Sequence, residues 1–334
     1  NNIIKLGKIH RDCYDAITVC KILGEVETNY AQYSDKQIKN MYISPYLTRG
    51  KFQLISNRKN PVCEVPEIRF GNMPNPTKGF IYTKKEMLEI LGEEPAAKDL
   101  FKRFLGNKDF LYNKEKYCLW LVDVPPNQIA NLKEIKKIIE GIREVRLKST
   151  NPDTIEKADT PTLFWWISQP KTEYLLIPSH TSENRKYIPF GFIKPEIIVG
   201  NSCMLIEGAN FYHFGVLSSI MHMTWVNYVC GRIKGDYRYS NEIVYNNYPW
   251  AKNPDEKHIK KVEEKAQALL EIRKKYPDSS LADLYAPITM PPDLVKAHNE
   301  LDKAVDKCYR SEPFKNELER IEFLFDLYEK YTEE

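Results

Sequence analysis

Apolar residues that recur every three or four positions mark the most regular helices of this chain. From Leu132 to Val145 they fall on one face of a predicted helix, because that spacing returns each side chain to the same side. A second helix is predicted over residues 83–91, where Thr83 and Glu86 have the spacing of a capping box. Residues 214–230 are almost continuously apolar and predict one helix buried on all sides.

Shorter apolar runs predict strands, separated by polar turns and by turns rich in Pro and Gly. The candidate strands are residues 117–122, 162–168, 174–178 and 197–206, with two further runs at 3–6 and 16–23. The residues between 43 and 78 are rich in Pro, Asn, Gly and Arg, so we expect an extended surface loop there.

Beyond residue 250 the pattern is helical. Three apolar stripes, punctuated by Pro277 and by Pro291-Pro292, predict three amphipathic helices with charged outer faces. Mixed elements followed by helices alone predict an α+β fold, in which a mixed-sheet domain is followed by a small C-terminal helical bundle.

Length and charge both indicate that the chain has two parts. Its 334 residues are enough for about two domains. Residues 251–334 carry 15 basic and 19 acidic side chains, which leaves 34 basic and 27 acidic side chains upstream. The formal net charge of +3 therefore conceals a balance of +7 in the first part and −4 in the tail. A basic first part favours an anionic partner.

Several classes of protein fit the sequence poorly. The seven cysteines are scattered and never spaced as CxxC, so they indicate neither a disulfide framework nor a zinc site. No basic-then-apolar leader follows Asn1, and the longest apolar run falls short of the ~20 residues that cross a bilayer. We therefore expect a cytoplasmic protein without a membrane partner, whose first residues continue from a longer polypeptide.

No catalytic motif is recognisable. The patterns GxGxxG, GxxxxGK[ST], GxSxG and HExxH are absent from the sequence. One carboxylate pattern, Pro254-Asp255 followed by Glu263-Glu264-Lys265, resembles a metal-dependent nuclease, but both halves fall on one predicted helix and indicate a solvated face. His213 and His222 are expected to be core histidines rather than metal ligands.

Two segments carry a signal for nucleic acid. Residues 182–187 and 231–239 interleave Arg and Lys with aromatic, hydroxyl and amide side chains. Such cations neutralise phosphates, and the polar groups add hydrogen bonds to the backbone of the nucleic acid. The phosphate candidates are Lys186, Arg232, Lys234 and Arg238. The alternative for the second segment is a helix C-cap at Gly231 followed by solvated charges.

Glu183 and Arg185 are candidates for reading bases. Arg pairs with guanine O6 and N7, and Glu accepts a hydrogen bond from cytosine N4. Two apart on an extended loop, the two side chains would point to one side and address the two bases of one pair. The alternative is that they form a salt bridge with one another on the surface.

Further cations and aromatic residues leave both interpretations open. Arg143, Arg146 and Lys148, near the end of the helix predicted at 132–145, suit the negative helix C-terminus and equally a phosphate. Tyrosines and tryptophans of this kind are more often core or interface residues than platforms for stacking bases. Those considered are Tyr237, Tyr239, Tyr245 and Trp250.

An ordered set of motifs resembles a known family. The set includes Cys63-Glu64-Val65-Pro66-Glu67-Ile68-Arg69-Phe70-Gly71-Asn72-Met73-Pro74, Ser182-Glu183-Asn184-Arg185-Lys186-Tyr187, Asp236-Tyr237-Arg238-Tyr239-Ser240 and Tyr245-Asn246-Asn247-Tyr248-Pro249-Trp250. From about residue 34 to the end, the chain resembles the C-terminal part of the MmeI-like family. These type IIL restriction–modification proteins join an endonuclease, an adenine-N6 DNA methyltransferase and a target recognition domain in one chain.

The resemblance implies three regions and a set of site residues. Residues 1–40 would be the trailing edge of a truncated methyltransferase domain, 41–250 the DNA target recognition domain, and 251–334 the C-terminal helical domain. Glu183 and Arg185 coincide with the family's base-reading pair. Lys148, Ser149 and Asn151 fall near another specificity region.

The methyltransferase tetrapeptide and its glycine-bearing loop are absent, and so is a nuclease core. S-adenosylmethionine and Mg²⁺ are therefore expected only in the parent polypeptide, and this chain is expected to do no chemistry itself.

The leading hypothesis is a double-stranded DNA recognition module that positions a target adenine for a catalytic domain outside this chain. Its expected partners are double-stranded DNA and the remainder of the parent polypeptide. The alternative is a protein-interaction or docking module that uses the acidic helical tail.

Overall fold

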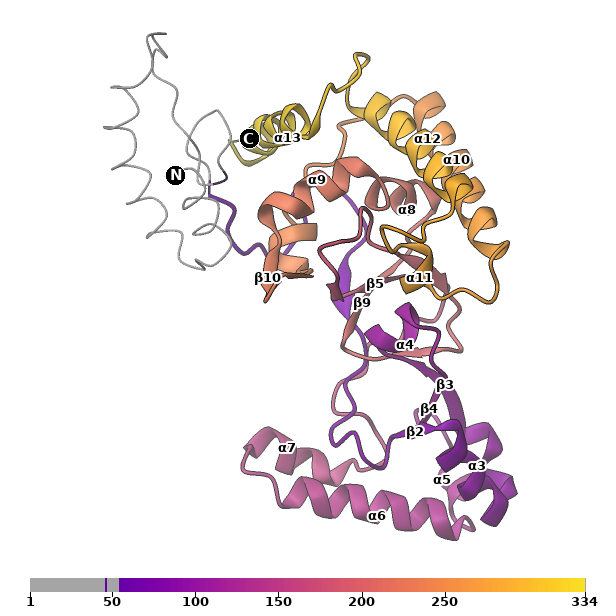
Figure 1. The fold of residues 1–334 in the computed structure, drawn as a ribbon. Helices are drawn as coiled ribbons and strands as arrows, with labels where there is room; N and C mark the ends of the chain where they lie inside the picture. The colour runs from indigo at the N-terminus through magenta and orange to yellow at the C-terminus, as the bar shows by residue number, and fades with distance from the viewer. Residues whose placement is uncertain (1–45, 47–53, 334) are drawn as a thin grey trace.

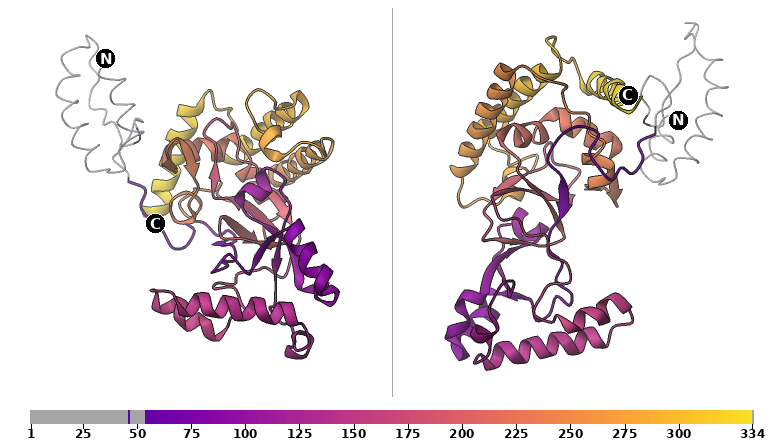
Figure 2. Two further views of the ribbon diagram at one scale, coloured as in Figure 1. Left: turned by 60° about the horizontal axis from the view of Figure 1, so that its bottom comes forward. Right: turned by 180° about the vertical axis from the view of Figure 1, so that it is seen from behind.

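The structure is a computed structural model that describes Tyr46 and residues 54–333. Within that part, a lower and an upper lobe are joined by a narrower waist (Figure 1). The same division is visible from behind (Figure 2). The strands predicted at residues 3–6 and 16–23, and the region predicted for residues 1–40, lie outside the described residues.

The lower lobe is a small sheet covered by helices. Antiparallel strands β2 (Ile81–Thr83), β4 (Lys116–Leu119) and β3 (Phe101–Leu105) are joined at the edge by β8 (Ile198–Val199), which runs parallel to β3. This pairing makes the sheet mixed. The helical elements are α3 (Lys84–Glu93), η1 (Pro95–Leu100), α5 (Pro126–Ile129), α6 (Lys133–Leu147), α7 (Pro152–Glu156) and η2 (Lys157–Asp159).

The two helices with the clearest sequence signals are confirmed here. At the start of α3 the Thr83 backbone N–H donates to Glu86 Oε2 at 2.7 Å, and the Glu86 N–H donates to Thr83 Oγ1 at 3.3 Å. This is the predicted capping box. Helix α6 covers the predicted stripe and buries Ile135 and Ile142. Strand β4 overlaps the strand predicted at 117–122, but it begins one residue earlier and ends at Leu119.

Two further sheets form the centre of the upper lobe. The larger has the antiparallel order β1 (Ile68–Phe70), β9 (Cys203–Glu207), β5 (Tyr174–Pro178), β7 (Gly191–Ile193). The smaller has the order β10 (Gly231–Ile233), β11 (Asp236–Arg238), β6 (His180–Thr181). The short helix α4 (Asn107–Leu111) packs against β5 near the waist. The α+β prediction is confirmed.

Helices cover the top of the upper lobe (Figure 1). They are α8 (Phe211–Leu217), α9 (Ile220–Val229), α10 (Glu256–Lys274), α12 (Pro292–Tyr309) and α13 (Glu317–Glu333). The short elements η3 (Asn241–Tyr245) and α11 (Leu281–Leu284) lie in the connections, and α11 contacts α4. Helix α10 packs against α8 and α12, and α13 packs against α9.

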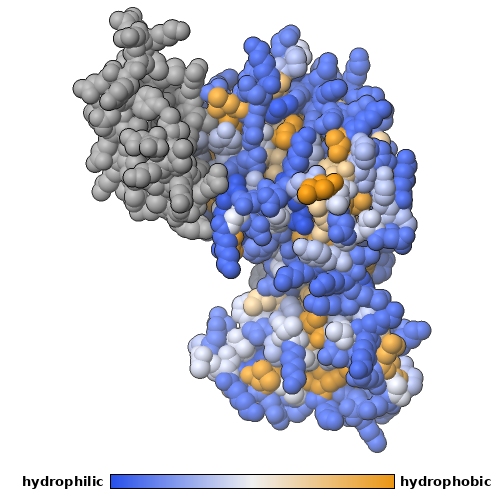
Figure 3. Space-filling view, viewed as in Figure 1, coloured by the Kyte–Doolittle hydropathy of each residue, from blue (hydrophilic) through white to orange (hydrophobic). Residues whose placement is uncertain are grey.

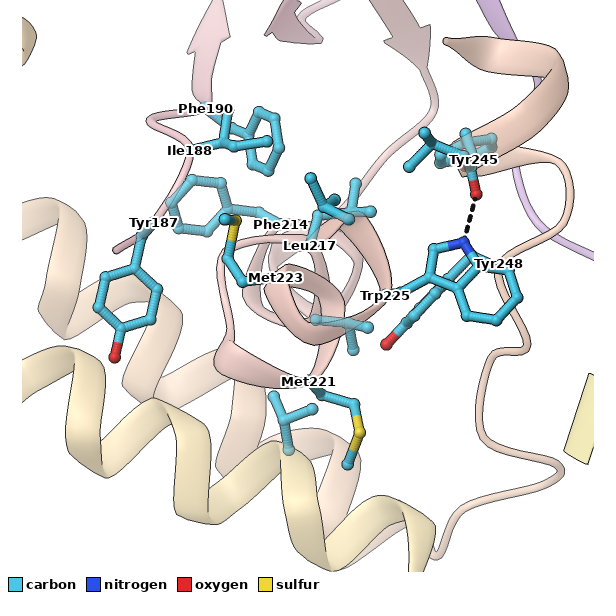
Figure 4. Close-up of a cluster of buried hydrophobic side chains, with 14 of the residues drawn as sticks. Tyr187, Ile188, Phe190, Phe214, Leu217, Met221, Met223, Trp225, Tyr245 and Tyr248 are labelled. Atoms are coloured by element: carbon cyan, nitrogen blue, oxygen red, sulfur yellow. Dashed lines mark hydrogen bonds between the residues drawn. The ribbon is translucent and has the colours of Figure 1, made fainter. Parts of the chain in front are cut away.

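One continuous apolar core joins the central sheet to these helices. It extends from Ile55 and Ile177 through Trp225 to Leu301 and Tyr328. Its central part, packed around Trp225, is drawn in Figure 4. The three amphipathic helices of the tail therefore bury their apolar stripes against the preceding part of the chain as well as against each other.

The prediction of one helix over residues 214–230 is wrong, because two helices occupy this segment. Helix α8 ends at Leu217, and Ser219 is extended with φ −92° and ψ 165° before α9 begins. The Ser219 hydroxyl donates to the Val216 carbonyl at 2.7 Å. The first N–H of α9, on Ile220, donates to the carboxylate of Asp302 from α12 at 2.7 Å. A carboxylate stabilises a helix N-terminus, and this one comes from a distant part of the chain.

Two predicted strands also differ from the structure. Residues 162–168 are irregular, apart from one bridge between Met73 and Trp166. The predicted strand at 197–206 is divided into β8 and β9 by a turn at residues 200–202. At this point a Cβ on Gly71 would lie 2.5 Å from the Gly200 carbonyl oxygen. Two backbones thus approach closely at the waist, which only glycine permits.

None of the helices in the described part of the chain is long and apolar enough to cross a membrane. Five of the seven cysteines lie in that part and are free thiols: Cys63, Cys118, Cys203, Cys230 and Cys308.

Candidate nucleic-acid interface

The small sheet of the upper lobe brings the two predicted nucleic-acid segments together. Strand β11 pairs with β10 on one side and with β6 on the other, placing Tyr237 opposite both Arg232 and Thr181. Residues 182–186 continue directly from β6. We call this assembly, β10, β11, β6 and residues 182–186, the hairpin site. Gly231 begins β10 after an extended Cys230, so the alternative of a helix C-cap at Gly231 is wrong.

Glu183 is held by the hairpin. Its carboxylate Oε2 accepts from Arg232 Nη1 at 3.3 Å, and Arg232 Nη1 also donates to the Gly235 carbonyl at 3.0 Å. The Arg232 guanidinium lies over the Tyr237 ring, 4.2 Å from its centroid. Since a Cβ on Gly235 would be 2.5 Å from Glu183 Oε1, the glycine leaves room for this carboxylate.

Arg185 points elsewhere. The loop turns at residues 182–185, where the Arg185 N–H donates to the Ser182 carbonyl at 3.2 Å. Arg185 is only 9% exposed, and its Nη1 donates to Thr181 Oγ1 at 3.0 Å. An extended loop with both side chains on one side is therefore not observed. A Glu183–Arg185 salt bridge is not observed either, because Glu183 pairs with Arg232.

The guanidinium of Arg185 keeps unused donors. Its Nε is buried without a hydrogen-bond partner, and no carboxylate of the described residues forms an ion pair with it. A guanidinium remains charged when buried, and a buried charge is unfavourable unless hydrogen bonds or an opposite charge compensate it. Arg185 therefore keeps a buried donor that has no acceptor in the described part of the chain.

Three of the four predicted phosphate contacts are exposed cations of the hairpin site. Lys186 lies with its Nζ 5.1 Å from the centroid of the Tyr187 ring. Lys234 occupies the hairpin turn with a positive φ of 61°. Arg238 is exposed and stands opposite His180 across the β11–β6 pair. The fourth, Arg232, is half-buried and supports Glu183.

His180 joins the hairpin site to the waist, and no sequence pattern pointed to this residue. Its backbone N–H donates to Asn107 Oδ1 at 3.3 Å, and its carbonyl accepts from Asn107 Nδ2 at 3.0 Å. Partial burial and the guanidinium of Arg238 lower the pKa of His180, while Asp236 opposes the shift. It lines a waist pocket of about 420 Å³ together with Asn107, Lys108, Asp109, Lys116, Asn201, Ser202 and residues of the adjoining loops.

The second predicted specificity region lies on the lower lobe. The α6–α7 junction is on the same side of the molecule as the hairpin but beyond the waist (Figure 1; Figure 2). The space-filling outline is hollowed between the lobes (Figure 3). Lys148 is exposed, with its Nζ 3.9 Å from a Glu144 carboxylate oxygen. Asn151 Oδ1 caps α7 by accepting from the Asp153 N–H at 2.9 Å, and the Asn151 N–H donates to Ser149 Oγ at 3.1 Å.

Arg146 cannot serve as a phosphate contact. It is fully buried, and Nε donates to the Asn75 carbonyl at 2.7 Å. Its Nη atoms donate to the carbonyls of Lys157, Thr160 and Leu163 at 2.8–2.9 Å. Long-range burial, which the helical pattern does not reveal, gives this cation a structural role in holding the α6–α7 junction.

The aromatic candidates of the sequence analysis and His222 lie in the core. Tyr237, Tyr239, Tyr245 and Trp250 are buried. His222 is buried too, and its Nε2 lies 2.9 Å from the Tyr239 hydroxyl.

The carboxylates of the nuclease-like pattern all lie on one helix, α10, or at its start. The described residues contain no group of three or more His, Cys, Asp or Glu that could hold a metal ion.

The chain matches two models of one protein family. The model of the MmeI target recognition domain matches residues 49–252, and that of the MmeI C-terminal domain matches residues 254–334. DNA methyltransferase A of Bacillus subtilis (strain 168) is 36% identical over 322 residues, which are 95% of this chain and 36% of the relative.

A solved structure of the Type IIL restriction–modification enzyme MmeI in complex with DNA is similar in fold. It superposes with a TM-score of 0.84 at 42% identity, covering 89% of this chain and 40% of that chain. The chain thus spans less than half the length of either relative.

Proposed function

Because the chain belongs to the MmeI family, we propose that it is the sequence-specific DNA recognition module of a type II restriction–modification enzyme. The observation that carries this proposal is the buried Arg185 with unused donors beside a hairpin of exposed cations. The substrate is double-stranded DNA, and the module positions one adenine for N6 methylation by a catalytic domain of the parent polypeptide.

The hairpin site suits the major groove of DNA. That groove admits a two-stranded β-ribbon, which is what β10 and β11 form. We assign base reading to Arg185 and Glu183, with Arg185 donating to guanine O6 and N7 and Glu183 accepting from cytosine N4. Arg232 is assigned a double role, because it fixes the Glu183 carboxylate and adds positive charge near the backbone.

Phosphate contacts are assigned to the exposed cations. Lys186, Lys234 and Arg238 carry no sequence information, but they set the orientation of the protein on the duplex. Lys148, Ser149 and Asn151 on the lower lobe are assigned a second contact beyond the waist. Their distance from the hairpin (Figure 1) suits an extended ligand that passes both lobes.

S-adenosylmethionine and Mg²⁺ are assigned to the rest of the parent polypeptide. The hairpin site combines exposed cations with the carboxylates of Glu183 and Asp236, and the described residues hold no group of three or more His, Cys, Asp or Glu that could bind a divalent cation. An adenine N6 is reached only when the base leaves the helical stack, so the parent must also supply the pocket that receives the flipped base.

A methylation assay on the full-length parent tests the proposal, with every single-base variant of its site as substrate. Arg185→Ala is expected to relax preference at one base pair by about 1–3 kcal/mol. Lys186→Ala, one residue away, is the matched control and should weaken methylation of all sequences alike. Unchanged specificity in Arg185→Ala would refute the assignment of this residue.

Salt dependence tests the DNA-binding module itself. Binding of a mixed-sequence duplex to the chain should fall steeply as salt rises, because cations that neutralise phosphates release counterions. Lys234→Ala should reduce the slope of log K against log salt by about one. Affinity that does not change with salt would contradict a phosphate-binding surface.

A further inference from the structure

The C-terminal helices reach under the segment that leads away from Arg185. Tyr187 is 1% exposed, and its ring stacks on the imidazole of His298 from α12 with 3.8 Å between centroids and 15° between planes. The Tyr187 hydroxyl donates to Asp302 Oδ2, also on α12, at 2.7 Å. In Figure 4 the ring stands on the side of the core that faces these helices.

Asp302 connects this segment to a second element. Its other oxygen, Oδ1, accepts from the Ile220 N–H at the start of α9, at 2.7 Å. Asp302 is only 8% exposed, so both hydrogen bonds of its carboxylate are largely shielded from water. One side chain of α12 therefore fixes Tyr187 relative to the helix layer of the upper lobe.

Helix α10 holds the same segment three residues further on. Arg273 Nη1 donates to the Phe190 carbonyl, and Arg273 Nε donates to the Tyr285 hydroxyl at 2.7 Å. The Tyr285 hydroxyl in turn lies 2.9 Å from His298 Nε2. A buried polar network thus connects α10, α12 and the residue after α11 to both ends of residues 187–190.

We infer that helices α10 and α12 set the position of the base-reading loop, with Tyr187, His298 and Asp302 as positioning residues. The inference rests on the proposed function. Residues 182–186 are anchored on one side by β6 and on the other by Tyr187, so the Tyr187–Asp302 bond is the nearest fixed point after Arg185. Base reading needs placement within a fraction of an ångström, which packing and surrounding hydrogen bonds of this kind provide.

Tyr187→Phe is the most direct variant, because it keeps the stacked ring and removes only the hydroxyl. Wild type and variant chains are used to select duplexes from a randomised pool, and the enriched duplex then competes with a mixed-sequence duplex. We expect the preference for the enriched duplex to fall about three- to tenfold in Tyr187→Phe. Affinity for the mixed-sequence duplex should be unchanged.

Tyr276→Phe is a matched control. Its hydroxyl donates to Asp293 Oδ1 at 2.8 Å, so the variant removes the same kind of bond from the same group of helices without touching residues 182–190. Base preference should be retained in this variant. Combining Tyr187→Phe with Arg185→Ala separates a positioning role from a general loss of structure. Once Arg185 is gone, Tyr187→Phe should reduce base preference less than it does in the wild-type chain, because only Glu183 is then left to read a base.

The outcomes are distinguishable. If the wild-type chain enriches no sequence, the proposed function fails. If it does enrich one and Tyr187→Phe keeps full preference, the inference is overturned. An equal loss on enriched and mixed-sequence DNA, or an undiminished effect in the Arg185→Ala background, would also overturn it by showing a merely structural role.

Discussion

The two lobes each contain a buried arginine beside predicted DNA contacts, and the two arginines differ in how they are satisfied. In the lower lobe, Arg146 donates to four backbone carbonyls. In the upper lobe, Arg185 donates to Thr181 and leaves a buried Nε without a partner. Burial alone therefore does not identify a recognition residue. The two arginines differ in how many of their donors have a partner within the described part of the chain.

The lobes also differ in how they are held together. The lower lobe relies on small apolar clusters around Phe101, Leu119 and Ile142, with Arg146 joining its helical connections. The upper lobe has one continuous core in which polar side chains connect the C-terminal helices to the hairpin site. Its polar groups are thus linked to the loop that we propose reads DNA.

The largest loss of stability is expected when Arg146, whose donors all have partners, is removed. Arg146→Ala leaves four buried carbonyls without their donor, and we expect the lower lobe to lose about 3–5 kcal/mol of unfolding free energy. Denaturant unfolding followed by hydrogen exchange of the α6 and α7 amides measures this loss. Arg143→Ala on the same helix is the control, since Arg143 makes an exposed i,i+3 pair with Glu140. Equal losses in the two variants would contradict the contrast between them.

The second-largest effect is expected on acidification, which should destabilise the upper lobe more than the lower lobe. Burial lowers the pKa of His222 to about 3, from 6.5. Its neutral form therefore contributes stability that is fully present above pH 6.5 and is lost as the pH falls towards 3. At pH 5 the loss is about 2 kcal/mol. Residues 69–170 contain no histidine, so the lower lobe lacks this penalty.

Asp302 acts in the opposite direction within the upper lobe. Burial raises the pKa of its carboxyl to about 6, so its contribution is fully present below pH 3.8 and is lost as the pH rises through 6. At pH 5 the protonation of Asp302 stabilises the folded upper lobe by about 1 kcal/mol relative to pH 7. This gain in unfolding free energy is smaller than the loss that His222 alone causes. Hydrogen exchange at pH 7 and pH 5, corrected for intrinsic rates, should show the upper lobe losing protection first. Earlier loss in the lower lobe would contradict this order.

Much of the fold was predictable because it depends on local pattern. The capping box at Thr83, the stripe of α6 and the helices of the tail follow from spacing within one element. The break at Ser219 was not predictable, because it depends on Asp302 from α12. The fate of Arg146 depends in the same way on carbonyls contributed by a separate loop.

The candidate site shows the same limit. Local composition indicated residues 182–187 and 231–239, but only strand pairing through β11 shows that they adjoin. The sequence left two partners for Glu183 open, a base or Arg185, whereas the structure gives Arg232. His180 was missed because one histidine beside a strand carries no signal until Arg238 stands opposite it.

A smaller effect is expected from crowding Glu183. In Gly235→Ala the new methyl group would meet the Glu183 carboxylate at 2.5 Å, and the side chain must move. We expect loss of about 1 kcal/mol of preference at one base pair, with little change in unfolding free energy. Gly231→Ala on the same hairpin is the control, because a Cβ there meets nothing within 4 Å. Competition between duplexes differing at one position measures both variants.

The central claim is that Arg185 is buried for a ligand and not for the fold. Arg185→Ala tests it most directly when unfolding and base preference are measured on the same preparation. We predict an unfolding free energy within about 1 kcal/mol of wild type, together with lost preference at a single base pair. A loss of stability as large as that of Arg146→Ala, with DNA binding weakened equally for every sequence, would contradict the claim.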